Sequence, residues 1–488
     1  MRFAAASAVV VLLVMAAEAQ VAADLVIINA DVWTMADRQP RAEAVAVVGN
    51  KIAAVGSTSE IRKLVGERTK VIDAGGKLVL PGFNDSHVHF MSIGNLFSTL
   101  DLRKIRTAGE LSELLKHYSR FLPKGRWILG SGGTDELWKQ IDGEMVDHLT
   151  RNNPLFLYHT NATSAVANSA AIVAGNVRAA RPGIVAGPQF DRIRFVVPND
   201  HSNNWAEVAE TASNYAASFG ITSVQDTDSD DHAEIYRELA RTGKLKVRVY
   251  DCHGLSNWKK YADAGIKSTG GDALVRTGCL KGNADIDENG KADLQREVIA
   301  ADKAGMQILI HAIGSAMNKT ALDVFENAAK VNGKRDRRFR VEHAERAAPS
   351  DISRFARLGI IASMQPYLFG WSGLENSYNR LIRQAGSKFA FGSDAAITSI
   401  DPLLGVQAAA YGAKSFEEVE RAIKGYTIDS AYAEFQENTK GSIEVGKLAD
   451  IVVIAIKNKN DASSVKDNWT VNTTIVDGRI VYNSELGK

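Results

Sequence analysis

The sequence predicts an α/β protein: a (β/α)8 TIM barrel with a composite β-sandwich built from both chain ends and an inserted subdomain. Three observations predict this architecture. Short apolar strands alternate with helical stretches through the middle of the chain. β-branched segments with Gly-Asn, Gly-Gly and Asp-Gly turn signals occupy both ends. One stretch, from about 95 to 215, is too long to be a single barrel helix.

The barrel is predicted from eight candidate strands that each end on a polar or ionisable residue. In a TIM barrel the carboxyl ends of all eight strands meet at one rim, where the active site lies. A doubly wound open sheet would need a Gly-rich phosphate turn after its first strand, and residues 85–89 (DSHVH) contain no glycine. The expected strand ends are His89, Asp226, Asp251, Asp285, His311, His343, Gln365 and Asp394.

The β-sandwich is predicted because neither end of the chain has enough strands to bury a sheet alone. Residues 25–33, 44–55 and 71–80 have strand character, as do residues 449–454 and 470–481. We therefore expect one β-sandwich from residues 20–80 plus 436–488, a barrel from 81–435, and an insertion within the barrel at about 95–215.

The balance of charged residues excludes a nucleic-acid-binding protein of the strongly basic kind. The 488 residues carry 58 Lys+Arg against 57 Asp+Glu, a formal net charge of +1, which excludes a strongly basic nucleic-acid surface.

Residues 1–19 resemble a signal peptide, with a positive start, an apolar run and the small residues Ala17 and Ala19. We expect an exported protein, periplasmic or secreted, with no membrane contact after cleavage. The expected partner is a small-molecule substrate, and a homodimer stays open.

The two cysteines exclude a disulfide-rich scaffold and a CxxC thiolate zinc site. These are Cys252 and Cys279. They either pair once or remain as two buried thiols.

A metal centre is indicated by His87 and His89, which lie two residues apart in a strand and so point to the same face. Two neutral imidazoles on one face can bind a divalent cation, and zinc, iron and nickel sites share this preference. A lone His-x-His pair is a weak signal. Here the ends of the fifth, sixth and eighth strands add His311, His343 and Asp394, which a closed barrel brings to the same rim.

Lys281 lies in the fourth strand, where an ammonium directed into the barrel is costly. Desolvation and nearby cations would depress its pKa, and a neutral amine can add carbon dioxide to form a carbamate. A carbamate can bridge two metal ions. A lysine that reaches the barrel rim is the equal alternative.

These motifs together resemble the amidohydrolase superfamily of metal-dependent hydrolases, and most closely its family 3, or YtcJ-like, branch. The matching segments are 80–90 (LPGFNDSHVHF), 310–314 (IHAIG), 338–345 (RFRVEHAE), 363–366 (SMQP), 391–397 (FGSDAAI), 425–435 (GYTIDSAYAEF) and 441–454 (GSIEVGKLADIVVI). The resemblance implies metal ligands at His87, His89, His311, His343 and Asp394, with Lys281 at the position of the family's carbamylated lysine.

The implied activity is hydrolysis of C–N bonds in a non-peptide amide, such as an N-acyl or N-formyl compound, by a metal-activated water. Asp394 is the expected catalytic base, and the expected cofactor is one or two divalent ions, with zinc as the expected metal. Two alternatives stay open: an ester or lactone hydrolase with the same site, and a binding protein that keeps the metal without turnover.

Weaker candidates surround this set. Tyr367 and Trp371 follow the seventh strand, His253 follows the third, and His159 lies in the insertion; each is a candidate substrate contact. Asp226 and Asp251 also end strands, but helix capping explains each of them equally well.

Overall fold

The protein is described by a computed structural model that covers residues 22–97, 99–159, 164–177, 181–198, 205–228, 231–368, 386–410, 415–461 and 464–485. The predicted signal peptide and Trp371 lie outside these ranges. Within the described ranges, no helix combines the length and the apolar character that a membrane crossing requires.

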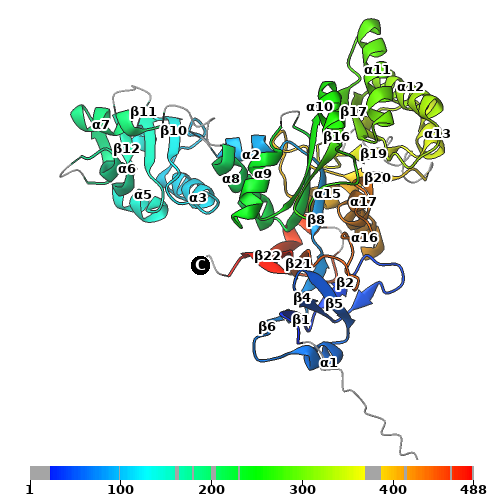
Figure 1. The fold of residues 1–488 in the computed structure, drawn as a ribbon. Coiled ribbons are helices and arrows are strands. Elements are labelled where there is room, and N and C mark those ends of the chain that lie inside the picture. The colour runs from blue at the N-terminus through cyan, green and yellow to red at the C-terminus, as the bar shows by residue number, and fades with distance from the viewer. Residues whose placement is uncertain are drawn as a thin grey trace, which may run out of the picture.

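Eight parallel strands form the central sheet, and this confirms the predicted barrel architecture (Figure 1). Neighbouring strands pair in chain order, as expected when each strand is followed by a crossover. β14 ends at the predicted Asp226, and five further strands end within two residues of the predicted position. The two largest differences are at β15, which ends three residues after Asp251, and β20, which ends three residues before Asp394. The strands are β8 (Phe83–Val88), β14 (Ile221–Asp226), β15 (Arg248–Gly254), β16 (Val275–Asn283), β17 (Gln307–Ile313), β18 (Arg340–Glu345), β19 (Ile361–Met364) and β20 (Phe389–Phe391).

The segment after β20 forms backbone hydrogen bonds with the end of β8, and so links the last strand of the barrel to the first. Asp394 N donates to the carbonyl oxygen of His87 (2.8 Å), and His89 N donates to that of Ala395 (2.6 Å). Gly392 permits this approach, because a Cβ at that position would lie 2.4 Å from His87 N. The contact brings Asp394 beside the two histidines of the His-x-His motif.

Helices cover the outside of the barrel. Apolar residues on the outer face of the strands, such as Val224 and Val249, pack in one buried cluster with Tyr236 and Leu239 of α9. The Asp287 side chain caps α11 by accepting a hydrogen bond from Gly290 N (2.8 Å). The helices are α8 (Trp205–Ser218), α9 (Ala233–Arg241), α10 (Trp258–Asp263), α11 (Glu288–Lys303), α12 (Ser315–Asn332), α13 (Pro349–Leu358), α15 (Pro402–Ala409), α16 (Phe416–Gly425), α17 (Ile428–Ala433) and the short α18 (Val465–Asn468).

Two further sheets pack into the β-sandwich below the barrel, where the blue N-terminal and red C-terminal segments lie together (Figure 1). Ile27 and Val45 of one sheet share a buried core with Val79, Val453 and Ile475 of the other. Both ends of the chain contribute to one sheet because β7 pairs with β21. In sheet order the strands are β5 (Lys51–Gly56), β4 (Ala44–Val48), β1 (Leu25–Ile28) and β6 (Lys70–Asp73); and β23 (Arg479–Asn483), β22 (Trp469–Val476), β21 (Ile451–Ile456), β7 (Leu78–Pro81), β2 (Asp31–Trp33) and β3 (Arg41–Ala42), with α1 (Thr58–Ile61) beside them.

The inserted subdomain is a separate mixed sheet with its own helices, at the left of Figure 1. Phe156, Ile172 and Phe190 form part of its own buried core. Its strands are β13 (Gly183–Ala186), β12 (Ser164–Ala167), β11 (Leu155–His159), β10 (Ile128–Gly133) and β9 (Thr99–Asp101), and the helices along this segment are α2 (Phe90–Leu96), α3 (Ala108–Ser119), α4 (Asp135–Trp138), α5 (Gly143–Thr150), α6 (Ser169–Ala174) and α7 (Pro188–Val196). The residue boundaries expected for the domains stay predictions.

The two cysteines form a disulfide between neighbouring barrel strands. Cys252 on β15 and Cys279 on β16 are register partners, with an S–S distance of 1.97 Å. Both are fully buried and pack with Tyr250 and Leu309. Of the two states that the sequence left open, the structure has the paired one. The disulfide lies two residues before Lys281 on the same strand.

Candidate metal centre

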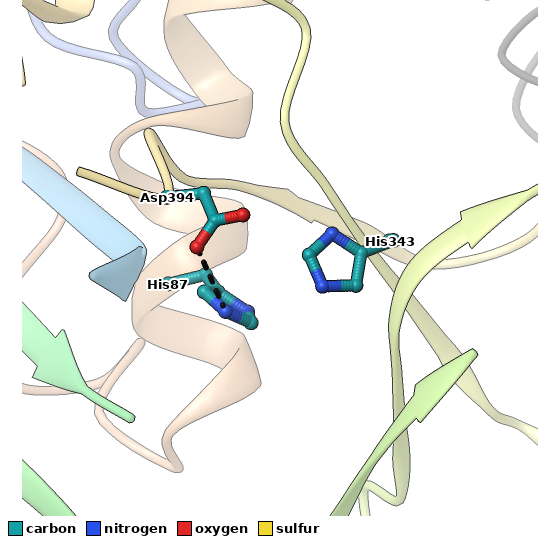
Figure 2. A group of neighbouring side chains, drawn as sticks. All are labelled: His87, His343 and Asp394. Carbon is teal, nitrogen blue, oxygen red and sulfur yellow. Dashed lines mark ion pairs between the residues drawn. The ribbon is translucent and has the colours of Figure 1, made fainter. Parts of the chain in front are cut away.

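Three predicted ligand residues converge at the carboxyl ends of the barrel strands. His87, His343 and Asp394 each offer one ligand atom, and these atoms all lie within 4.8 Å of one another. Figure 2 shows the Asp394 carboxylate directed at the His87 ring, with the His343 ring facing both. All three side chains are buried. The residues come from the first strand, the sixth strand and the segment after the eighth.

The other two predicted histidines lie beside this group. His89 Nε2 is 3.4 Å from Asp394 Oδ1, and His87 Nε2 is 3.5 Å from the same oxygen. The His311 ring lies 4.5 Å from that of His343, and the His343 ring lies 5.0 Å from that of His87. The barrel therefore brings together all five residues of the predicted imidazole and carboxylate set.

Lys281 reaches the same group from β16. Its Nζ lies 3.2 Å from His87 Nε2. Burial lowers the pKa of the Lys281 amine to about 8, so the neutral amine that carbamate formation needs is accessible near physiological pH. The amine is directed into the centre rather than out along the rim.

The protonation states of these side chains fit a divalent cation. Burial, with the Lys281 charge, lowers the pKa of His87 to about 4, and burial also holds the pKa of His343 far below its ordinary value. Burial would raise the pKa of Asp394, but the hydrogen bond from His89 and the charges of the histidines hold it below its usual range. Neutral imidazoles around a charged carboxylate are the donor set that zinc and similar ions bind.

His89 differs from the other histidines. Its Nδ1 lies 2.7 Å from Asp228 Oδ1. The hydrogen bonds to Asp228 and then to Asp394 raise the pKa of His89 to about 9. In the metal-free protein His89 therefore carries a proton at neutral pH, and a cation bound at its Nε2 would have to displace that proton.

The sequence did not reveal the residues that hold His87 in place. Glu342 on β18 bonds to Nδ1 of His87 and leaves Nε2 facing the centre. Arg340, fully buried on the same strand, donates from Nε to Oε1 of Glu342 (2.8 Å) and from Nη2 to Oε2 (3.1 Å). Carboxylates that bind the outer nitrogen of a metal-ligating histidine fix its tautomer and ring orientation. Glu342 has this role toward His87, although it is adjacent in sequence to His343.

Two aspartates hold neighbouring segments. Asp85 Oδ1 accepts hydrogen bonds from the backbone N–H groups of His87 (3.1 Å) and Ser393 (2.9 Å), and so fastens the two ligand segments together. Burial raises the pKa of Asp85 to about 7. Asp228 instead contacts the ring of His89, with its Oδ1 2.7 Å from Nδ1. In the strand at residues 83–89 (FNDSHVH), alternation places Asp85 on the same face as His87 and His89, so the sequence could have shown that Asp85 lies near the site. No local pattern could have shown the same for Asp228.

The backbone at His343 departs from strand geometry. His343 and Ala344 have φ values of 71° and 53°, in the left-handed region that non-glycine residues rarely adopt. Strict alternation would direct Glu342 and His343 to opposite faces of β18. The left-handed turn lets both side chains reach His87, one by its carboxylate and one by its ring.

The weaker candidates lie elsewhere. His253 is buried against Tyr261 and groups with Asp231 and Asp251 rather than with His87. His159, in the inserted subdomain, pairs with Asp135 (3.0 Å). Tyr367 follows β19 and is partly exposed. Their proposed substrate contacts stay predictions, and Trp371 is outside the described residues.

Comparisons with known proteins agree with this geometry. The model of the amidohydrolase family matches residues 70–482. Protein LONG AFTER FAR-RED 3 of Arabidopsis thaliana is 28% identical, with 95% of this chain and 92% of the relative aligned. N-substituted formamide deformylase of Arthrobacter pascens is 27% identical over 94% of this chain and 98% of its own. Putative amidohydrolase YtcJ of Bacillus subtilis (strain 168) is 26% identical over 92% and 98%.

Solved structures share the fold. An uncharacterized metal-dependent hydrolase from Pyrococcus furiosus superposes with a TM-score of 0.60 at 24% identity, covering 88% of this chain and 98% of that one. An adenosine deaminase from Xanthomonas campestris with bound zinc superposes with a TM-score of 0.55 at 16% identity, covering 94% and 93%. The family match extends over most of the chain, and the histidines and aspartate that the fold gathers are those of a metal-dependent hydrolase. The chain therefore belongs to amidohydrolase family 3.

Proposed function

We propose that this protein hydrolyses a C–N bond in a non-peptide amide, such as an N-acyl or N-formyl compound. The observation that carries this proposal is the meeting of neutral imidazoles with one charged carboxylate: His87, His343 and Asp394 offer ligand atoms within 4.8 Å of one another. The relative from A. pascens, named as a deformylase of N-substituted formamides, supports an amide as the substrate.

We infer one or two divalent ions, with zinc as the metal. The ligand residues would be His87, His89, His311, His343 and Asp394, and a carbamylated Lys281 would help to hold a second ion. When bound, such an ion supplies Lewis acidity and lowers the pKa of a water molecule toward ~7. The thiolate-free donor set and the zinc in the structurally similar adenosine deaminase support this choice.

Side chains of this protein would then transfer the proton of the attacking water. Asp394 is ionised at neutral pH, because His89 and the neighbouring histidines keep its pKa low. Its carboxylate can accept the proton of the attacking water and deliver it to the leaving nitrogen. Glu342 keeps the His87 ring in one orientation during these transfers, and Asp228 does the same for His89.

The partner is a small-molecule substrate, and the protein acts outside the cytoplasm, in the periplasm or after secretion. The predicted signal peptide at residues 1–19 motivates this location, and the Cys252–Cys279 disulfide supports it, because such bonds persist in oxidising compartments. A homodimer is compatible with this function.

The test is a screen of N-formyl, N-acyl, ester and lactone compounds with metal-replete protein, together with elemental analysis of the same preparation. We expect turnover of the N-formyl or N-acyl compounds and one to two equivalents of zinc at the candidate metal centre. Turnover confined to esters or lactones would replace the proposed substrate class. Bound metal without any turnover would indicate a binding protein. Absence of metal, and no uptake when it is added back, would overturn the proposal altogether.

A further inference from the structure

A second group of metal-ligating side chains lies apart from the six predicted ligand residues. Asp231, Asp251 and His253 each offer one ligand atom, and these atoms all lie within 4.8 Å of one another. Asp251 and His253 belong to β15, and Asp231 precedes α9 in the connection from β14. Because Tyr250 and Cys252 of β15 pack inside the barrel, alternation directs Asp251 and His253 toward the helix layer.

Asp251 has a buried carboxylate for which the described residues provide no hydrogen bond. Its side chain is fully buried, and neither carboxylate oxygen has a hydrogen-bond partner among the described residues. The Nε2 atom of His253 lies 3.6 Å from Oδ2, within ion-pair distance but beyond hydrogen-bond length. A buried carboxylate is costly unless it is paired or coordinates a metal. The described side chains therefore give an ionised Asp251 no hydrogen bond, and His253 is its ion-pair neighbour among them.

The neighbouring strand offers a direct comparison. Asp226 is the register partner of Asp251 and is equally buried. Its oxygens accept hydrogen bonds from the N–H of Phe90 (3.1 Å), the N–H of Asp228 (3.2 Å) and the hydroxyl of Tyr236 (2.6 Å). Asp226 thus accepts the N–H of the first residue of α2 from a neighbouring strand, although the N-cap residue of that helix is His89. Asp251 caps none of the described helices.

The surrounding charges are mostly negative. Burial and the carboxylates of Asp226, Asp231 and Asp228 raise the pKa of Asp251 well above its usual value, and Arg237 acts in the opposite direction. Arg237 itself pairs with Glu234. Lys260 Nζ lies 2.6 Å from Asp231 Oδ2, with both side chains substantially exposed. Arg237 and Lys260 are thus each paired with a carboxylate other than that of Asp251.

The ring of His253 is held by an aromatic neighbour. Its ring stacks on that of Tyr261, with centroids 4.2 Å apart and planes at 10°. One imidazole with two carboxylates and no thiolate is a donor set suited to zinc, manganese or ferrous iron. The Asp231 side chain is partly exposed and gives an ion a path from solvent.

We propose that a divalent transition-metal ion binds to Asp231, Asp251 and His253, at a second site behind the rim of the barrel. The ion supplies the positive charge that compensates the Asp251 carboxylate. It also links Asp231, which precedes α9, to β15. The connection from β14 to α9 also carries Asp228, whose carboxylate bonds to Nδ1 of His89 (2.7 Å). Occupancy of the second site therefore steadies a residue that orients a ligand of the first.

The test is a titration of chelator-treated full-length protein with Zn²⁺ and, separately, Mn²⁺, followed by calorimetry and by elemental analysis after desalting. We expect Asp251→Asn to bind one equivalent fewer than the native protein. The matched control is Asp263→Asn, which removes an exposed acid from the adjacent α10 and should bind the native number of ions. A variant with His87→Ala and His343→Ala should keep the second ion and lose it when Asp251→Asn is added.

Asp231→Asn provides a measurement that does not depend on a buried substitution. Because Asp231 is exposed, its replacement leaves the fold intact and should weaken the second ion by at least about tenfold. This variant decides the question if Asp251→Asn fails to fold. Native stoichiometry and native affinity in Asp231→Asn would overturn the proposal and leave Asp251 as a protonated acid. Because the measurement counts ions, it is independent of the activity proposed for the first site.

Discussion

The carboxylate of Glu342 on β18 bonds to Nδ1 of His87 on β8, across the interior of the barrel. Arg340 in turn holds Glu342 by two hydrogen bonds, at 2.8 and 3.1 Å. The three side chains form a buried chain of contacts that ends at the candidate metal centre. His87 presents Nε2 to that centre because its other nitrogen is already engaged.

Glu342→Gln tests this contact. The amide keeps the shape of the side chain but loses its charge, so the affinity for the metal should fall by about 10- to 100-fold. Arg340 loses its anionic partner, and the free energy of unfolding should fall by about 3 kcal/mol. Competition with a chromophoric chelator measures the affinity, and urea unfolding measures the stability. Glu288→Gln, on the exposed first turn of α11, is the control. An unchanged affinity would show that the ring needs no such support.

Asp394→Asn should abolish turnover while most of the metal stays bound. The amide can still contact an ion but cannot accept the proton of water, so kcat should fall by about 100-fold or more with little change in KM. Steady-state kinetics and elemental analysis of the same sample check both parts. Near-native kcat would move the base role to another residue. Asp263→Asn should match the native enzyme.

Lys281→Ala distinguishes a bridging carbamate from a simple amine. The lysine Nζ lies 3.2 Å from His87 Nε2 and has a pKa of about 8, so both states are chemically accessible. If the carbamate forms, the variant should lose metal and activity, and short carboxylic acids should restore part of each. If the variant keeps its metal, and added carboxylic acid changes neither its metal content nor its activity, the site is mononuclear. Lys303→Ala, at the exposed end of α11, controls for the lost charge.

Metal binding should strengthen as the pH rises toward 9. The contacts to Asp228 and Asp394 raise the pKa of His89 to about 9, so below that pH a proton competes with the ion. One displaced proton corresponds to about a tenfold gain in apparent affinity per pH unit. Calorimetry in buffers of different ionisation enthalpy counts the protons released. Asp228→Asn removes the largest cause of the raised pKa and should flatten this dependence between pH 7 and 9. An equally steep dependence in that variant would assign the proton to another group.

Removal of the disulfide should destabilise the barrel. Cys252 and Cys279 are separated by 27 positions in sequence, and their joint replacement by alanine should lower the free energy of unfolding by about 3 kcal/mol. Urea unfolding of the native and double-variant proteins measures the difference. Alkylation of two thiols in the unfolded, unreduced native protein would contradict the pairing.

The sequence by itself determined the architecture and the residues that converge on the centre. Strand alternation and the polar residue at each strand end are local properties, and a closed parallel barrel turns equivalent strand ends into one rim. The positions of His87, His89 and Asp394 along the chain are therefore enough to predict that these three side chains meet. The family motifs added Lys281 at the same rim.

Only the tertiary structure decided what holds those residues. Glu342 and His87 are 255 positions apart, and they meet because of barrel closure and a left-handed backbone at His343, which defeats simple alternation. Asp228 reaches His89 from a loop that carries no periodic signal. The cysteines pair because register aligns them on adjacent strands. Contacts between distant segments depend on the register and closure of the whole sheet, and no local pattern in the chain encodes them.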